Sequence, residues 1–172
     1  MKTKIWKTKN AGRPTQWEDI MKTIVKHWIL SLIVLVGLAL PAHAEERGTR
    51  DEAKSMSVSA ASFLTANGKD KAFAAFDDGT DGFKNKDLYV FAYDLTGTCL
   101  AHGLNKALIG KNLIGLKDVD GKPLIAEIVA VTAPAWVDYK WKNPQTGAIE
   151  LKHAYIVRAG DVVVGVGAYD HP

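Results

Sequence analysis

Five strand-like segments in the second half of the chain limit it to very few folds. Each is rich in β-branched, aromatic and aliphatic residues, and they occupy residues 88–94, 98–102, 136–141, 149–158 and 162–169. Short turns separate the first two segments from each other and the last three from one another. Turns this short join only antiparallel neighbours. The pattern therefore predicts one five-stranded antiparallel sheet.

Helical patterns lie before and between these segments. Residues 49–67 carry apolar side chains at helical spacing, with Thr49 placed to cap the start, and residues 70–76 form a second, shorter pattern. After the glycine-rich connection 103–121, a further helix is expected from Pro123 to Val131. One long helix can cover one face of a sheet. We therefore expect an α+β domain with a long N-terminal helix packed on the sheet.

Residues 21–44 have the three parts of a secretory signal peptide. A short basic region precedes an apolar run over residues 28–40, and Ala42-His43-Ala44 supplies the small-x-small cleavage pattern. The run is shorter than the roughly 20 residues that span a membrane, although an uncleaved anchor is the alternative interpretation. Cleavage would leave residues 45–172 as a single domain, periplasmic or secreted, without a transmembrane anchor.

Residues 1–20 match neither a folded segment nor the usual start of a signal peptide. The tripeptide Met21-Lys22-Thr23 repeats the opening Met1-Lys2-Thr3. We expect either that translation starts at Met21 or that residues 1–20 form an unstructured basic extension.

The net charge of the chain depends on this leader. Residues 1–44 hold seven of the 22 basic and two of the 19 acidic residues, which leaves 15 basic and 17 acidic residues in 45–172. The formal charge changes from +3 to −2, and no basic stripe remains to bind nucleic acid. Since Cys99 is the only cysteine, the chain can form neither an internal disulfide nor a multi-thiolate metal site.

Several blocks of the chain occur together in a known family. The run DLYVFAYDLTGTCLAHGLNKALIGKNLIGLKDVDGKPLIAEIV is followed by WVDYKWKNPQTGAIELKHAYIV and then by VVVGVGAY, with FLTANGKDKAFAAF before them. In this order they resemble the single Cache domain of type 2, over nearly all of residues 51–170. The resemblance implies a PAS-like Cache fold with an extracytoplasmic pocket for a small molecule, often an organic acid or amine.

The resemblance also implies a sensor module that acts in signal transduction. Family members often precede a transmembrane helix, a chemoreceptor module or a kinase, whereas this sequence ends at Pro172, three residues after the last strand. We therefore expect the signal to pass to a separate partner, a membrane sensor or chemoreceptor. The alternative is an interaction protein that keeps the Cache fold and fills the pocket with side chains.

The first predicted hairpin offers one face suited to a ligand. With a two-residue turn at Leu95-Thr96, Tyr93 faces Thr98, Phe91 faces Leu100 and Tyr89 faces His102. This face is aromatic with polar tips, as small-molecule sites are, while Cys99 would lie on the opposite, helix-covered face. The same rings could instead fill the core, and His102 could be either a ligand contact or a structural histidine.

Two further segments supply candidates through the resemblance. It implies that Tyr139 and Trp141 form part of the pocket wall, although an edge strand with an aromatic inner face would show the same alternation. Lys152 matches a lysine typical of the family and would pair with a ligand carboxylate. Its neighbours in the alternation, Ala154 and Ile156, are apolar, which favours an inward lysine over a solvated one.

The remaining motifs do not indicate chemistry. The segment 118–121 (DVDG) lacks the later ligands of a calcium loop and predicts a turn. Gly165-Val166-Gly167 lies inside a strand, where it indicates close packing of another backbone or a ligand rather than a dinucleotide site. No nucleophile motif, metal-ligand spacing or cofactor motif occurs. We therefore expect a binding protein without metal or cofactor, and not an enzyme.

Overall fold

The computed structural model describes residues 46–170. The predicted extension of residues 1–20 and the predicted signal peptide of residues 21–44 lie outside the described residues. None of the helices between residues 46 and 170 has the length and apolar character that a membrane crossing requires.

Helix α2 (Arg50–Asn67) begins at a capping box. The Glu52 N–H donates to the Thr49 hydroxyl (3.2 Å), and the Thr49 N–H donates to the Glu52 carboxylate (2.8 Å). Gly68, with φ of +80°, ends α2 and leads directly into α3 (Lys69–Asp78). Both helices expected in this region are confirmed.

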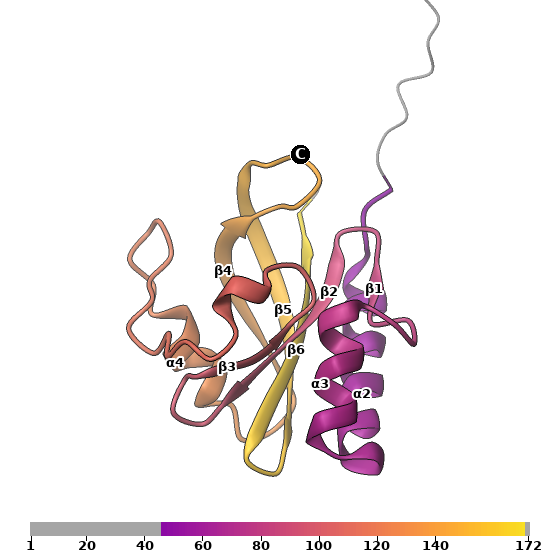
Figure 1. The fold of residues 1–172 in the computed structure, drawn as a ribbon. Coiled ribbons are helices and arrows are strands. Elements are labelled where there is room, and N and C mark those ends of the chain that lie inside the picture. Colours follow the sequence, from indigo (N-terminus) through magenta and orange to yellow (C-terminus); the bar gives the residue numbers. More distant parts are fainter. Residues whose placement is uncertain (1–45, 171–172) are drawn as a thin grey trace, which may run out of the picture. The chain divides into compact units, whose positions relative to one another are not determined.

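The sheet has six strands rather than the predicted five. They are β1 (Lys84–Asn85), β2 (Leu88–Asp94), β3 (Cys99–His102), β4 (Ala135–Lys142), β5 (Ile149–Ala159) and β6 (Val162–Tyr169). All pairs are antiparallel, in the order β1-β2-β6-β5-β4, and β3 also pairs with β2 (Figure 1). The additional strand, β1, consists of two exposed residues inside a segment with the composition of a loop. Its sequence has no alternation of apolar residues that would predict a strand.

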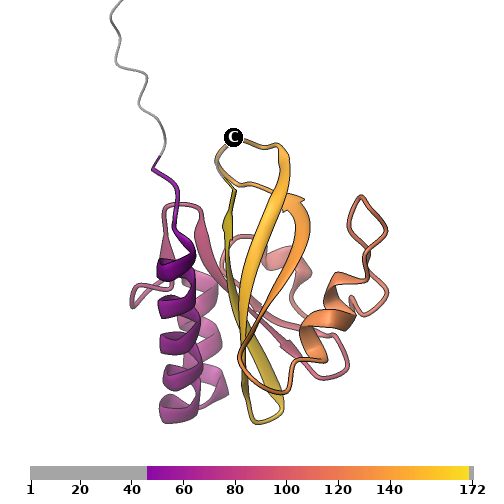
Figure 2. The same ribbon diagram turned by 180° about the vertical axis from the view of Figure 1, so that it is seen from behind.

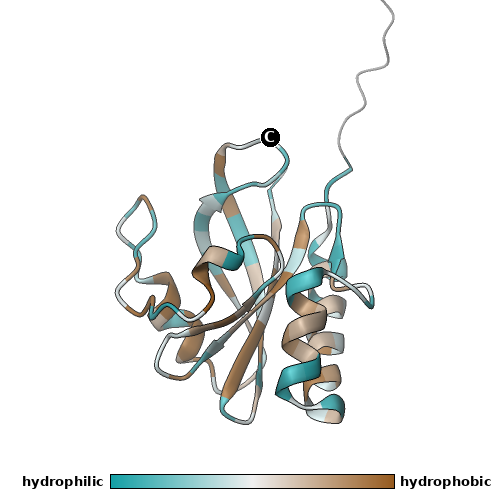
Figure 3. Ribbon diagram, viewed as in Figure 1, coloured by the Kyte–Doolittle hydropathy of each residue, from teal (hydrophilic) through white to brown (hydrophobic). Residues whose placement is uncertain are grey.

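Each face of the sheet buries its own core, and we call the two the helix face and the pocket face. Figures 1 and 2 show α2 and α3 together on the helix face, with α4 (Leu124–Val129) on the other side. The helix-face core is mainly aliphatic with a group of Phe rings, and includes Ala53, Ala60, Leu64, Phe76, Leu88, Val90, Val164 and Val166. The pocket-face core is richer in aromatic rings and includes Tyr89, Phe91, Tyr93, Ile125, Ile128, Tyr139 and Ile156. Figure 3 shows the hydrophobic colour concentrated along the central strands.

The predicted register of the first hairpin is wrong by two residues. Phe91 pairs with His102, and a bulge after Ala92 sets Tyr93 opposite Cys99. The Asp94 carboxylate accepts hydrogen bonds from the Thr96 and Thr98 N–H groups (2.9 and 2.8 Å), which makes the turn longer than the two residues expected.

The observed register leaves the side chains of β2 on their predicted face but changes the face of Cys99 on β3. A shift of two residues keeps the same faces, so the aromatic side chains of β2 remain on the pocket face with His102. The bulge moves Cys99 to the pocket face, which corrects the prediction that it lies under the helices.

The connection between β3 and β4 lies on the pocket face. It contains a 3₁₀ turn, η1 (Lys106–Leu108), and the predicted turn at Asp118, whose carboxylate accepts from the Asp120 and Lys122 N–H groups. Helix α4 is shorter than predicted, because Pro123 caps it rather than forming its first turn.

Candidate functional site

The seven predicted site residues all belong to the pocket face or its rim. They are Tyr89, Phe91 and Tyr93 on β2, His102 on β3, Tyr139 and Trp141 on β4, and Lys152 on β5. Six of them are buried, and Trp141 is partly exposed. The alternation along β2, β4 and β5 therefore predicts the observed face for these residues, whereas along β3 it misplaces Cys99.

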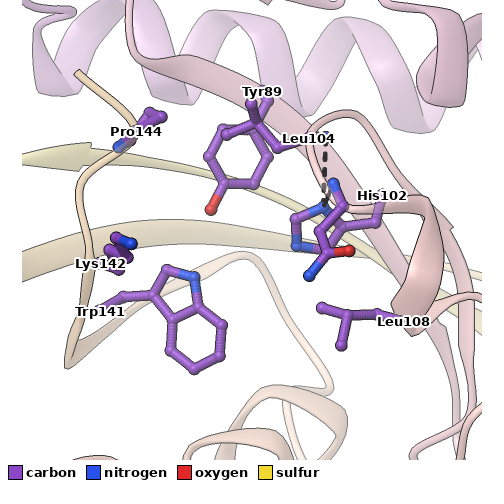
Figure 4. A pocket seen from close by; sticks show the side chains of 8 residues that line it. Tyr89, His102, Leu104, Leu108, Trp141, Lys142 and Pro144 are labelled. Carbon is purple, nitrogen blue, oxygen red and sulfur yellow. Dashed lines mark hydrogen bonds between the residues drawn. The ribbon is translucent and has the colours of Figure 1, made fainter. Parts of the chain in front are cut away.

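A cavity of about 250 Å³ opens on this face. Its lining comes from β2, from the end of β3 and the segment through η1, and from the end of β4 and the β4–β5 turn. It comprises Tyr89, His102, Leu104, Asn105, Leu108, Trp141, Lys142 and Pro144 (Figure 4). The lining is mostly apolar and includes neither Asp nor Glu. Such a composition is typical of sites for small molecules with an apolar part and few polar groups.

Only three of the seven predicted residues line this cavity, namely Tyr89, His102 and Trp141. The sequence pattern misses Leu104, Asn105, Leu108 and Pro144 because they lie in irregular segments or a short 3₁₀ turn, where no periodicity marks an inward side chain. It also misses Lys142, the last residue of β4, because a charged side chain at a strand end is expected to face solvent. The sequence feature that could have indicated them is the connection 103–121 with its four glycines. This connection contributes Leu104, Asn105 and Leu108 to the cavity lining.

Phe91, Tyr93 and Tyr139 lie deeper than the cavity wall. They pack with one another and with the apolar side chains of α4, and Tyr93 is 5.8 Å from Phe91 between ring centroids. Burial raises the pKa of Tyr93 and of Tyr139 well above the usual range, so both phenols stay protonated. In this structure the three rings fill the core, which is one of the two roles considered for them.

His102 presents a hydrogen-bond donor to the cavity. Its Nδ1 accepts from the N–H groups of Leu104 (3.3 Å) and Asn105 (3.0 Å), so the proton of the neutral ring lies on Nε2. Figure 4 shows this second nitrogen turned toward the space between Tyr89 and Trp141. Burial, together with the charge of Lys152, lowers the pKa of His102 to about 4, which keeps the ring neutral near pH 7.

Lys152 is fully buried, and its amine has no hydrogen-bond partner among the described residues. Three aromatic rings surround Nζ, with centroids at 3.9 Å (Tyr89), 4.9 Å (Tyr169) and 5.7 Å (Phe91). Burial lowers the pKa of Lys152, against the opposing influence of Tyr89 and Asp87. A buried ammonium without a hydrogen-bonding acceptor is costly, so this position is strongly biased toward an anion.

Two glycines of β6 make room for this arrangement. A Cβ on Gly167 would overlap the side chain of Lys152, and one on Gly165 would overlap Phe91 and Ile156. The stem of Lys152 therefore crosses the middle strand from β5 toward β2. The groups that closely approach Gly165 and Gly167 are side chains, not the backbone or ligand expected there.

No group of three His, Cys, Asp or Glu side chains in residues 46–170 is arranged to hold a metal ion.

The fold agrees with that of the proteins that this chain resembles. A family model described as Single Cache domain 2 matches residues 49–171. The sensor histidine kinase MctS of Rhizobium johnstonii is 32% identical over 171 residues, which is 95% of this chain and 33% of the relative. The chain thus spans about a third of the length of that curated relative.

Solved structures share the fold. A methyl-accepting chemotaxis protein from Vibrio parahaemolyticus matches with a TM-score of 0.59 and 25% identity, over 70% of this chain and 87% of that chain. A Cache chemosensory domain solved for its carboxylic acid recognition matches with a TM-score of 0.52 and 23% identity, over 69% and 86%. Since the family model covers most of the sequence and the antiparallel sheet with its packed helices agrees, this protein belongs to the single Cache domain 2 family.

Proposed function

We propose that this protein is an extracytoplasmic sensor module that binds a small organic acid and passes the signal to a separate partner. The observation that carries the proposal is the Lys152 ammonium, which is fully buried next to the cavity without a hydrogen-bond partner among the described residues. A ligand carboxylate would supply the missing acceptor and a compensating charge.

The polar groups favour an acid over an amine. Lys152 can only donate, and His102 offers its Nε2–H toward the cavity, while no Asp or Glu lines it. The nearby buried carboxylate, Asp87, already accepts a hydrogen bond from the Gly48 N–H (2.6 Å). A ligand ammonium would therefore meet a nearby buried cation and no carboxylate in the cavity wall.

The relatives support the role in signalling. One is named a sensor histidine kinase, another a methyl-accepting chemotaxis protein, and a third is described as recognising carboxylic acids. The signal-peptide pattern of residues 21–44 supports a location outside the cytoplasm. We infer that the partner is a membrane sensor or chemoreceptor.

Thermal unfolding of residues 45–172 with a panel of ligands tests the proposal. The panel pairs formate, acetate, propionate and benzoate with amines of matching size. An acid at 100 times its dissociation constant should stabilise the domain by about 2.7 kcal/mol, whereas the amines should have no effect.

Two lysine variants make this test specific. Lys152→Met should abolish the stabilisation by the acid, since Met keeps the length of the side chain without its charge. Lys142→Met, at the rim of the same cavity, should largely retain it. Stabilisation by amines, or by no member of the panel, would contradict the proposal and favour the alternative of an interaction protein.

A further inference from the structure

Lys152 is close to the cavity but does not line it. The wall at this point is Tyr89, whose ring lies 3.9 Å from the Lys152 Nζ. The amine is enclosed by Tyr89, Phe91 and Tyr169, and it has no exposed surface. In this arrangement an anion in the cavity would meet the ring of Tyr89 before it met the amine.

The ring of Tyr89 holds the lysine through its π electrons. An ammonium over an aromatic face is attracted to the negative ring quadrupole, and the attraction is greatest where water is excluded. Tyr89 thus supplies, weakly, the electrostatic complement that a carboxylate would supply strongly. The ring and a bound carboxylate compete for the same cation.

Tyr89 also contacts the segment that covers the cavity. Its ring packs on His102, with 5.1 Å between centroids and an interplanar angle of 32°. His102 Nδ1 in turn accepts hydrogen bonds from the N–H groups of Leu104 and Asn105, near the start of the connection. A movement of the Tyr89 ring would therefore disturb the support of this connection.

We propose that Tyr89 is a gate that occupies Lys152 in the ligand-free protein and must turn aside before a carboxylate can pair with the amine. This inference rests on the proposed function and adds the order of the steps by which an acid would bind. The ring leaves Lys152, the carboxylate takes its place, and the displaced ring changes its packing against His102 and the connection. Acid binding is thereby coupled to the surface formed by residues 103–110.

The first experiment concerns the ligand-free protein. A double-mutant cycle in urea combines Tyr89→Leu with Lys152→Met, and it should show a coupling of about 10- to 30-fold in the unfolding equilibrium constant. Tyr89→Phe keeps the ring and should keep the coupling. Phe91→Leu is the matched control, because its ring lies farther from Nζ and outside the cavity wall, and its coupling to Lys152→Met should be smaller. If Tyr89→Leu does not fold, Tyr89→Met replaces it.

The second experiment follows acid binding by stopped-flow fluorescence. In a Trp136→Phe background, Trp141 at the cavity is the remaining tryptophan of residues 45–172 and reports binding. With formate, acetate, propionate and benzoate as probes, the observed rate should reach a plateau at high concentration, because opening of the gate limits it. Tyr89→Leu should remove the plateau, and Phe91→Leu should retain it.

The outcomes separate the gate from the proposed function. Additive effects in the urea cycle, or the same concentration dependence in wild type and Tyr89→Leu, would overturn the gate while acid binding stands. Failure of every probe to bind to wild type and to Tyr89→Leu would overturn both.

Discussion

Lys152 and His153 are adjacent in β5, yet their side chains enter opposite faces of the sheet with opposite results. On the helix face, His153 Nδ1 bonds to Asp138 (2.7 Å), and Nε2 lies 2.9 Å from Asp170 and 2.6 Å from Arg50. On the pocket face, Lys152 has three rings around it and no hydrogen-bond partner among the described residues. The difference separates a polar group whose partners lie within the fold from one whose acceptor, in the proposed function, is the ligand.

A second network of partnered polar side chains lies at the end of the sheet near the β4–β5 turn. Arg47 forms two hydrogen bonds with Glu150 (2.7 and 3.1 Å), and the amide of Asn143 donates to the same carboxylate (2.8 Å). These bonds connect the segment before α2 with the β4–β5 turn. The polar side chains there have partners within the domain, as those of a structural network should.

Removal of His153 should give the largest change in stability. His153→Leu leaves Asp138, Asp170 and Arg50 without their shared partner, and we expect a loss of up to about 3 kcal/mol. Urea unfolding measures this loss, while the affinity for a carboxylate should remain that of wild type. An affinity that fell in parallel with stability would remove the distinction between the two faces.

The pH dependence of stability should come in part from His102. Its pKa is lowered from 6.5 to about 4 in the folded protein, so the unfolded chain binds the proton more readily between these values. The contribution of neutral His102 to the free energy of unfolding is complete above about pH 6.5. It is lost as the pH falls, by about 2 kcal/mol at pH 5. His102→Gln should lack this part of the loss when the two proteins are unfolded in urea at pH 7.5 and pH 5. Parallel curves for the two proteins would show that His102 is not held neutral.

Lys152→Met should act in the opposite sense to His153→Leu. Replacing a buried cation that has no hydrogen-bonding acceptor by an apolar side chain of similar length is expected to leave stability unchanged or to raise it by up to about 2 kcal/mol. Urea unfolding without ligand measures the effect, with Lys142→Met as the control at an exposed position. A clear loss of stability would mean that the aromatic rings already satisfy the lysine.

The smallest expected effect concerns the start of α2. Thr49→Ala removes the capping hydroxyl and should cost about 1 kcal/mol, whereas Thr49→Ser should retain most of the stability. Acid affinity should be unaffected, as for every change confined to the helix face. Calorimetric titration of Thr49→Ala with the acid that stabilises wild type checks this.

The fold was largely predictable because its elements carry local signals. The alternation of β2, β4 and β5 assigns the correct face to every candidate side chain, and Thr49 marks the start of α2. The strand pairing near Asp94 was not predictable in the same way. This pairing depends on the Asp94 carboxylate, which accepts hydrogen bonds from two N–H groups of the turn. The spacing of apolar residues gives no information on such a contact.

The site was predictable as a face and not as a cavity. Lys152 could be assigned inward from its apolar neighbours at alternate positions, but its enclosure depends on Gly167 of the adjacent strand and on Tyr89 of the strand beyond. The contact between Lys152 and Tyr89 joins residues more than 60 positions apart in the sequence. The lining residues from 104 to 108 and at the β4–β5 turn depend on how irregular segments lie over the sheet.

The bare backbone at Gly165 and Gly167 gives β6 a further significance. Because the middle strand has no side chain at these two points, long side chains from both neighbouring strands can meet above it without disturbing the ladder of hydrogen bonds below. The chemical character of the space is then decided by one position on β5. Under the proposed function, a carboxylate at residue 152 in place of the lysine would favour amines over acids, with the backbone of the sheet unchanged.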